Sequence, residues 1–181
     1  MTLYVIRHGR TGNNDAGIFN GRFDEDINET GIAQAEKARE TIKNLDIDII
    51  VCSPLLRTRH TAAIVNAKDL PIITDEHFIE RDTGELTGKS AASIDREKFW
   101  NYYSDYAKQF KNAETVPEIT ARVKEGLDGI REKYPDKNIL IVTHNGVARA
   151  IAYYFNGMPK DGSMLHIGEL DNCGIRKYEF K

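Results

Sequence analysis

Short apolar runs recur along the chain and predict buried β-strands. They cover residues 3–6, 47–52, 70–74 and 139–143, and most of their positions carry large aliphatic side chains. Runs of this length, rich in β-branched residues, are typical of strands that are covered on both faces of a sheet. The run 139–143, Ile-Leu-Ile-Val-Thr, is the strongest of the four.

Helical spacing of apolar positions separates these runs. Asn28 is an expected N-cap of a helix whose apolar face comprises Ile32, Ala35, Ala38, Ile42 and Leu45. A second helix is expected to open after Ser53, with Pro54 at an early helical position, where its missing N–H group costs nothing. Residues 115–118, Thr-Val-Pro-Glu, have the form of a capping box and predict a helix that ends near Pro135.

The rest of the chain predicts further elements. A helix is expected from residue 144 to Gly157, and two strands, 164–170 and 173–180, are expected around an Asp-Asn turn at 171–172. A polar helical region carries an aromatic stripe, which is most simply core packing and alternatively one wall of a substrate pocket. Its members are Phe99, Tyr102, Tyr103, Tyr106 and Phe110.

This alternation of strands and helices predicts an α/β fold. We expect three layers, α/β/α, with a mostly parallel sheet that is covered on both faces, and a short helical insertion. Residues 1–181 are expected to form a single domain, because a chain of this size suits one substantial core.

Composition excludes several classes of function. The net charge is −3, which gives no reason to expect nucleic acid or an anionic membrane as a partner. With only Cys52 and Cys173 there is no disulfide framework, and the opening apolar run is too short for a signal peptide, so we expect a cytoplasmic protein. No Cys/His spacing or carboxylate cluster suggests a metal site, and no cofactor is expected.

Charged and imidazole side chains follow the predicted strands. Arg7 and His8 follow the first run, Arg57 the second and His144 the fourth, while Glu80 lies in the loop after the third. The carboxyl ends of parallel strands meet at one edge of a sheet, where ligands bind in open α/β folds. We therefore expect these five side chains to converge.

Such a set suits phosphoryl transfer. The planar fork of arginine matches phosphate oxygens, and nearby arginines depress the pKa of a histidine and keep it neutral. A neutral imidazole can attack phosphorus and form a covalent intermediate, and a carboxyl group can protonate the leaving oxygen. The set predicts a reaction through phosphohistidine that needs no metal.

The motifs that contain these residues resemble those of a known family. The chain resembles the histidine phosphatase superfamily, in the branch of cofactor-dependent phosphoglycerate mutases and small-metabolite phosphatases. Arg10, Thr83 and Asn145 stand where the family usually has an acidic or amide residue, an aromatic residue and a glycine. The matching segments are Arg7-His8-Gly9 with Thr11 and Asn14, Phe19-Asn20-Gly21, Ser53-Pro54-Leu55-Leu56-Arg57, Glu80-Arg81-Asp82-Thr83-Gly84 and His144-Asn145-Gly146.

The resemblance implies a role for each matched residue. His8 would be the nucleophile, Glu80 the proton donor, and Arg7, Arg57 and His144 the groups that hold the phosphoryl group. The further candidates for contact with phosphate or substrate are Asn14, Asn20, Gly21, Arg81 and Asn145. Arg81, like Arg59, is expected to be a surface or rim cation. Asp82 competes with Glu80 as the acid, since residues two apart in an extended loop share a face.

Three functions remain open. The favoured one is a phosphomonoesterase that acts on a small phosphorylated metabolite. A mutase is the second, although residues 89–116 form a short insertion and Thr83 departs from the tyrosine that mutases carry. A catalytically inactive phosphoryl-binding protein is the third. The substrate is also open among sugar phosphates, phosphoglycerates, nucleotides and α-ribazole phosphate, and we expect residues 15–25 and 81–116 to select it. The oligomeric state is left open.

Overall fold

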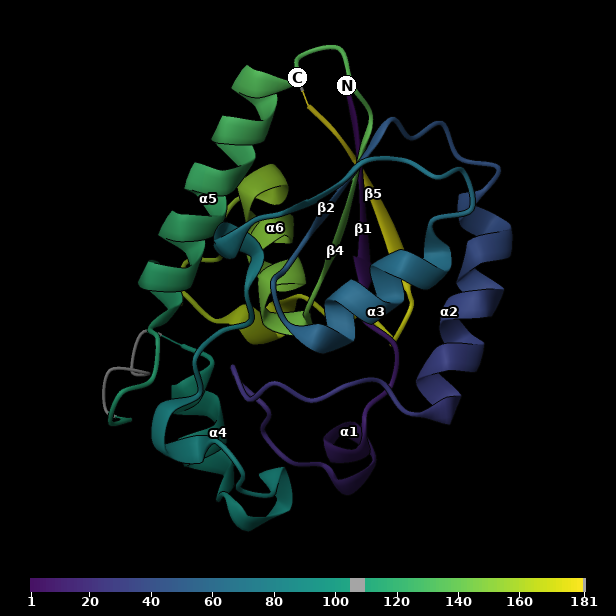
Figure 1. Cartoon of the computed structure of the whole chain (residues 1–181). Coiled ribbons are helices and arrows are strands. Elements are labelled where there is room, and N and C mark those ends of the chain that lie inside the picture. The colour runs from purple at the N-terminus through teal and green to yellow at the C-terminus, as the bar shows by residue number, and fades with distance from the viewer. Residues whose placement is uncertain (105–109, 181) are drawn as a thin grey trace.

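The computed structural model describes residues 1–104 and 110–180. Helices and strands alternate along most of this chain (Figure 1). They are β1 (Thr2–Arg7), α1 (Gly12–Ala16), α2 (Glu29–Ile42), β2 (Ile49–Cys52), α3 (Leu56–Val65), β3 (Ile72–Thr74), α4 (Arg96–Tyr102), α5 (Val116–Lys133), β4 (Ile139–Thr143), α6 (Asn145–Asn156) and β5 (Ile175–Glu179).

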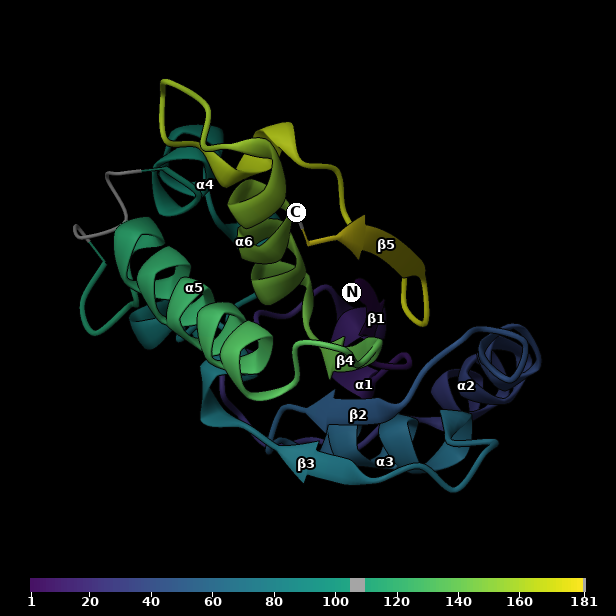
Figure 2. The ribbon, with the colours of Figure 1, turned by 90° about the horizontal axis from the view of Figure 1, so that it is seen from above.

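The strands form one sheet in the order β3-β2-β4-β1-β5. β1 and β2 both pair in parallel with β4, β3 pairs in parallel with β2, and only β5 is antiparallel, against β1. Helices α2 and α3 cover one face and α5 and α6 the other (Figures 1 and 2). The expected α/β/α layers and mostly parallel sheet are confirmed.

Two cores lie on the two faces of the sheet. Alternate residues of β1 point to opposite sides, so that Leu3 and Val5 pack in the core with α5 and α6, whereas Tyr4 and Ile6 pack with α2 and α3. All five residues of β4 are buried. Both faces of the central strands are therefore covered, which is why these strands read as unbroken apolar runs.

The expected helix starts are mostly confirmed. The Asn28 side chain accepts a hydrogen bond from the Gly31 N–H group and caps α2, and Thr115 and Glu118 form a reciprocal capping box at α5. Pro54, in contrast, is not in a helix. It precedes Leu55, which is the N-cap of α3. The proline is therefore part of the turn that leads into the helix and not of its first turn.

The expected strand 164–170 is wrong. Residues Met164–His166 form a 3₁₀ turn, and only Ile175–Glu179 of the tail joins the sheet. Met164 and Leu170 are buried in the core beneath α6, and the Met164 N–H group donates to the carbonyl of Tyr103 at 2.7 Å. This segment therefore buries its apolar side chains against helices and leaves the outer edge of β5 without a paired neighbour.

The insertion between β3 and α5 lies at the carboxyl end of the parallel strands. In Figure 1 its helix α4 lies at the end of the molecule opposite the start of β1. Tyr102 and Phe110 form a small separate core there with Leu86. Tyr106 of the expected stripe lies outside the described residues. The described part of the chain contains no helix with the length and apolar character needed to cross a bilayer.

Candidate active site

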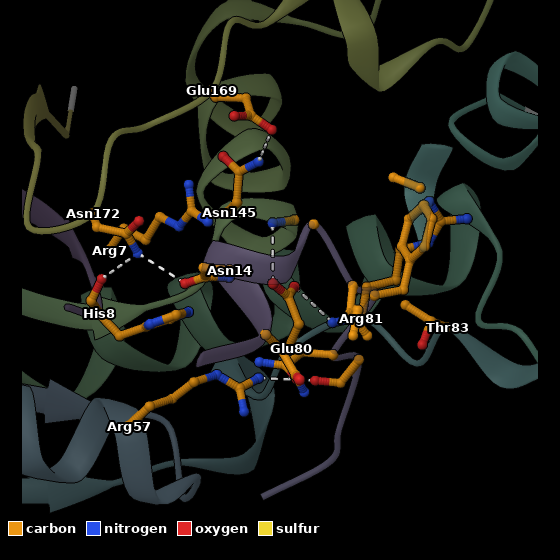
Figure 3. Close-up of a pocket in the computed structure, with 18 of the residues that line it drawn as sticks. Arg7, His8, Asn14, Arg57, Glu80, Arg81, Thr83, Asn145, Glu169 and Asn172 are labelled. Atoms are coloured by element: carbon orange, nitrogen blue, oxygen red, sulfur yellow. Dashed lines mark hydrogen bonds between the residues drawn. The ribbon is translucent and has the colours of Figure 1, made fainter. Parts of the chain in front are cut away.

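A cavity of about 490 Å³ opens at the carboxyl ends of β1 and β4 (Figure 3). It is of the size that small-molecule sites usually have. Nine of the ten candidate residues line it, and the tenth, His144, lies directly behind, with its ring centroid 5.2 Å from that of His8. The nine are Arg7, His8, Asn14, Asn20, Gly21, Arg57, Glu80, Arg81 and Asn145.

His8 follows the last residue of β1, and its backbone N–H group continues the ladder to Thr143 at 2.9 Å. Its Nδ1 lies 2.7 Å from the carbonyl oxygen of Gly9. A carbonyl can only accept, so Nδ1 carries the proton and Nε2 keeps a lone pair. Burial lowers the pKa of His8 well below its ordinary value, and Arg57 and Arg7 lower it further. The ring is therefore a neutral imidazole, and none of the described residues hydrogen-bonds to its Nε2.

His144, the N-cap residue of α6, is fully buried. Its Nδ1 accepts a hydrogen bond from Nε of Arg57 at 3.2 Å, and its Nε2 lies 2.7 Å from Oγ of Ser53. Since Nδ1 is the acceptor, Nε2 carries the proton and donates to Ser53. Burial lowers the pKa of His144 well below its ordinary value, and the positive charge of Arg57 lowers it further.

Arg57 is buried in the wall of the cavity. Its Nη1 and Nη2 donate to the carbonyl oxygens of Phe23 and Gly21, both at 2.8 Å. The guanidinium group therefore joins the loop before α2 to the edge of the sheet. Gly21 has a φ of +49°, and a Cβ there would lie 2.3 Å from Oγ1 of Thr83, so only glycine fits between these two loops.

Arg7 has a donor without an acceptor. Its Nη1 donates to the carbonyl of Leu170 at 2.9 Å, but Nε is buried and has no hydrogen-bond partner in the part of the chain that the structure describes. Burial lowers the pKa of Arg7, an effect that Glu169 and Glu80 oppose. An unsatisfied buried donor costs about 1–3 kcal/mol. An oxyanion in the cavity would supply the missing acceptor.

Glu80 enters the cavity beside the first turn of α6. One carboxylate oxygen accepts from the N–H group of Arg81 at 2.8 Å, and the other lies 3.5 Å from the N–H group of Gly146 (Figure 3). A Cβ on Gly146 would lie only 2.6 Å from the carboxylate. Asp82, the competing acid, turns elsewhere: its Oδ1 accepts from the Gly84 N–H group at 2.8 Å.

Comparison with known proteins identifies the family of the chain. The family model of the histidine phosphatase superfamily (branch 1) matches residues 3–181. The chain belongs to this superfamily. It is 36% identical to an uncharacterized phosphatase, PhoE, of Bacillus subtilis, over 97% of this chain and 86% of the relative. It is 33% identical to a putative phosphoserine phosphatase 2 of Hydrogenobacter thermophilus, over 96% of this chain and 86% of the relative.

Solved structures of the superfamily share the fold. The crystal structure of the alpha-ribazole phosphatase from Shigella flexneri matches with a TM-score of 0.83 and 27% identity, and covers 100% of this chain and 91% of that one. The expected family and enzyme class, a phosphatase of the histidine phosphatase superfamily, are confirmed.

Within this family fold Arg81 departs from expectation. It is not a surface or rim cation but is 2% exposed. Its Nε and Nη2 donate to the carbonyls of Glu114 and Tyr102, both at 2.8 Å, and its guanidinium carbon lies 4.0 Å from the centre of the Tyr102 ring. Its Nη1 lacks a hydrogen-bond partner among the described residues. The insertion folds over this side chain, which a loop position in the sequence does not reveal.

Asn145 and Asn14 both line the cavity. Asn145 donates to Glu169 at 3.3 Å and accepts from the N–H group of Leu170 at 3.1 Å. Asn14 accepts from the side chain of Asn172 at 3.2 Å. Arg10 also lines the cavity, where it forms an ion pair with Asp15.

Three residues that were not predicted from the sequence line the same cavity, namely Glu169, Asp171 and Asn172. Asn172 donates to the backbone carbonyl of His8 at 3.0 Å as well as to Asn14. These residues precede β5, the antiparallel strand, so the start of β5 lies at the edge where the parallel strands end. An antiparallel edge strand inferred from the tail would have predicted this placement.

Aromatic side chains form part of the cavity wall. Phe99, Tyr102 and Tyr103 of the expected stripe line the cavity together with Phe19. Phe110 packs against Tyr102 outside it, with the ring centroids 5.8 Å apart. Of the two interpretations of the stripe, the pocket wall holds for Phe99, Tyr102 and Tyr103, and core packing holds for Phe110 and also for Tyr102.

Proposed function

We propose that the chain is a phosphomonoesterase that hydrolyses a small phosphorylated metabolite through a phosphohistidine on His8. The observation that carries the proposal is the His8 imidazole. Its Nδ1 proton is donated to the carbonyl of Gly9, and within the described part of the chain its Nε2 has no hydrogen-bond partner. The two arginines that lower its pKa, Arg57 and Arg7, both line the cavity beside it. A nucleophile and the charge that receives a phosphoryl group thus lie side by side.

In the first step, the Nε2 lone pair attacks phosphorus and the bond from phosphorus to the ester oxygen breaks. Glu80 gives its proton to that oxygen, so the alcohol leaves neutral. The Nε donor of Arg7 and the guanidinium of Arg57 stabilise the equatorial oxygens. His144 has two roles here. Its Nδ1 accepts from Nε of Arg57 and so holds the guanidinium group in position. Its Nε2–H group, which is bonded to Ser53, can exchange that bond for one to a phosphoryl oxygen.

In the second step, water attacks the phosphohistidine on phosphorus and Glu80 takes its proton. The bond to Nε2 breaks, phosphate leaves, and His8 returns to its starting tautomer. No metal ion or cofactor takes part. The residues proposed to contact phosphate or substrate all line the cavity, and they are Asn14, Asn20, Gly21, Arg81 and Asn145.

The charges of the outer cavity favour hydrolysis over mutase chemistry. Beyond the phosphoryl end the lining carries the cations Arg10 and Arg81 and the anions Glu80, Glu169 and Asp171, and Arg10 is paired with Asp15. A mutase must hold a second anionic group while water is kept out. This balance offers no surplus of positive charge for that group. An inactive binding protein is the least favoured alternative, because each element of the proposed chemistry is present.

The aromatic wall favours a leaving group with a flat or apolar portion. Phe19, Phe99, Tyr102 and Tyr103 line the cavity. α-Ribazole phosphate, whose leaving group carries a heteroaromatic ring, is therefore the specific alternative activity, and the Shigella flexneri relative is named for it. We further propose that residues 1–181 act as one cytoplasmic domain, without nucleic acid or membrane as a partner.

A labelling experiment tests the proposal. The enzyme, mixed with a ³²P-labelled phosphomonoester and quenched rapidly, should carry label that is stable to alkali and lost in acid, as a phosphohistidine is. His8→Ala should carry none, and inorganic phosphate rather than an isomer should accumulate with the wild type. Label that persists on His8→Ala would disprove the nucleophile.

A further inference from the structure

Tyr103, which follows the last residue of α4, has a hydroxyl group without a partner. No described residue hydrogen-bonds to that hydroxyl, and it is not among the polar atoms sealed away from solvent. By contrast, the hydroxyls of Tyr153 and Tyr154 in α6 donate to Ser163 and Asp128. Buried tyrosines usually find a partner for this group. Tyr103 lines the cavity, so its unpaired hydroxyl is a candidate to contact a bound substrate.

The Tyr103 phenol lies near Glu80, the proposed proton donor. Its main charged neighbours are Arg149, Arg81, Glu80 and Glu169. Burial raises the pKa of Tyr103, which the two arginines oppose. The phenol is therefore protonated at neutral pH and able to donate a hydrogen bond.

Arg149, on α6, is a buried cation that the proposed chemistry does not use. Its guanidinium carbon lies 5.1 Å from the centre of the Tyr103 ring, and its Nε has no hydrogen-bond partner in residues 1–104 and 110–180. Arg81 approaches the same ring at 6.0 Å. Burying a guanidinium group costs free energy unless another group attracts its charge, and the face of an aromatic ring does so through a cation–π interaction. Arg149 thus holds the ring in place.

We propose that Tyr103 is a specificity-determining residue of this phosphatase, whose hydroxyl donates a hydrogen bond to the leaving-group portion of the substrate, and that Arg149 positions its ring. This inference rests on the proposed function. Glu80 delivers its proton to the ester oxygen. Tyr103 lies near Glu80, so its hydroxyl is expected to contact the part of the leaving group that follows that oxygen. The preferred substrates are therefore those with a neutral hydroxyl oxygen close to the ester.

Two substrates with the same carbon skeleton test the contact. Glycerol 1-phosphate has acceptor oxygens in its leaving group, and n-propyl phosphate has none. The wild type should prefer glycerol 1-phosphate in kcat/KM. Tyr103→Phe keeps the ring and removes only the hydroxyl, so it should lower kcat/KM for glycerol 1-phosphate about three- to tenfold, the worth of one neutral hydrogen bond, and leave n-propyl phosphate within about twofold.

Tyr154→Phe is the matched control, because it removes a phenol hydroxyl that bonds to Asp128, outside the cavity lining. It should leave both substrates unchanged. An equal loss for the two substrates in Tyr103→Phe, no loss for either, or a wild type that does not discriminate between them would each overturn the contact. A wild type that hydrolyses no phosphomonoester and forms no phosphoenzyme would instead contradict the proposed function, and with it this inference.

Arg149→Met tests the positioning role. It keeps most of the side-chain volume and removes the charge, so it should reduce the preference for glycerol 1-phosphate as Tyr103→Phe does. The double variant Tyr103→Phe, Arg149→Met should lose no more preference than Tyr103→Phe alone, because both changes act through one hydroxyl. Additive losses, or an Arg149→Met preference equal to that of the wild type, would show that Arg149 does not act through Tyr103.

Discussion

Arg57 and His144 are joined by a hydrogen bond from Nε to Nδ1, 3.2 Å long, in a part of the wall where both side chains are buried. Because arginine can only donate, this bond requires His144 to be neutral. A proton on Nδ1 would break it and place two cations in contact. His8, 5.2 Å away between ring centroids, is held neutral in the same surroundings.

This relationship predicts how stability depends on pH. Burial lowers the pKa of both His8 and His144 in the folded protein, so below the ordinary value of about 6.5 the unfolded chain binds more protons. The free energy of unfolding should therefore fall as pH decreases from about 7 to 5, by at most about 1.4 kcal/mol per pH unit for each histidine. Urea unfolding at a series of pH values measures the slope.

His144→Gln separates this effect from that of other groups. The variant lacks one titrating site, so its stability should fall less steeply with decreasing pH over the same range. A slope unchanged from the wild type would mean that His144 is protonated in the folded state and that the bond from Arg57 has been misassigned.

A second prediction concerns the geometry of Arg57. Arg57→Lys keeps a positive charge but cannot hold the carbonyls of Phe23 and Gly21 and His144 together, as the fork of the guanidinium group does. We expect kcat/KM to fall at least about tenfold. Arg59→Lys, an exposed position of the same helix, is the control and should have near-normal kinetics. Near-normal kinetics for Arg57→Lys would show that only its charge matters.

Gly146 supplies a third prediction. A Cβ there would lie 2.6 Å from the Glu80 carboxylate, so Gly146→Ala must displace that carboxylate or the first turn of α6. We expect turnover of an alkyl phosphate to fall about tenfold or more, with folding retained. In Gly129→Ala the new Cβ of helix α5 meets open space, and helix propensity predicts a gain of about 0.5–1 kcal/mol in stability without a change in turnover. Equal activity of both variants would show that the position of Glu80 is not critical.

The layers of the fold were predictable because they depend on local patterns. The runs at β1, β2 and β4 are apolar on both faces, and Asn28 and Thr115 sit in recognisable caps. Parallel strands then require Arg7, His8, Arg57 and His144 to meet, whatever the loops do.

Other features depend on contacts between distant segments. The burial of Arg81 arises from the carbonyls of Tyr102 and Glu114, and nothing in the loop that contains Arg81 encodes them. The position of Glu169 follows from the antiparallel β5, whose pairing the tail pattern left ambiguous. Apolar alternation at 164–170 resembled a strand, but Met164 and Leu170 lie in the helical core instead.

The last prediction decides between Glu80 and Asp82 as the proton donor. The structure turns Glu80 into the cavity and engages Asp82 with the N–H group of Gly84. A general acid matters most when the departing oxygen is basic, and a positioned acid contributes about 10²- to 10⁴-fold. An alkoxide needs its proton, whereas a nitrophenolate leaves readily without one.

Glu80→Gln should therefore reduce kcat for an alkyl phosphate far more than kcat for p-nitrophenyl phosphate, because it removes the proton but keeps the shape of the side chain. Asp82→Asn should change both rates by the same small factor, since its Oδ1 can still accept from Gly84. A selective loss in Asp82→Asn but not in Glu80→Gln would reverse the assignment. Equal losses for both substrates in both variants would mean that neither carboxylate protonates the leaving group, and that both act by shaping the loop between β3 and α4.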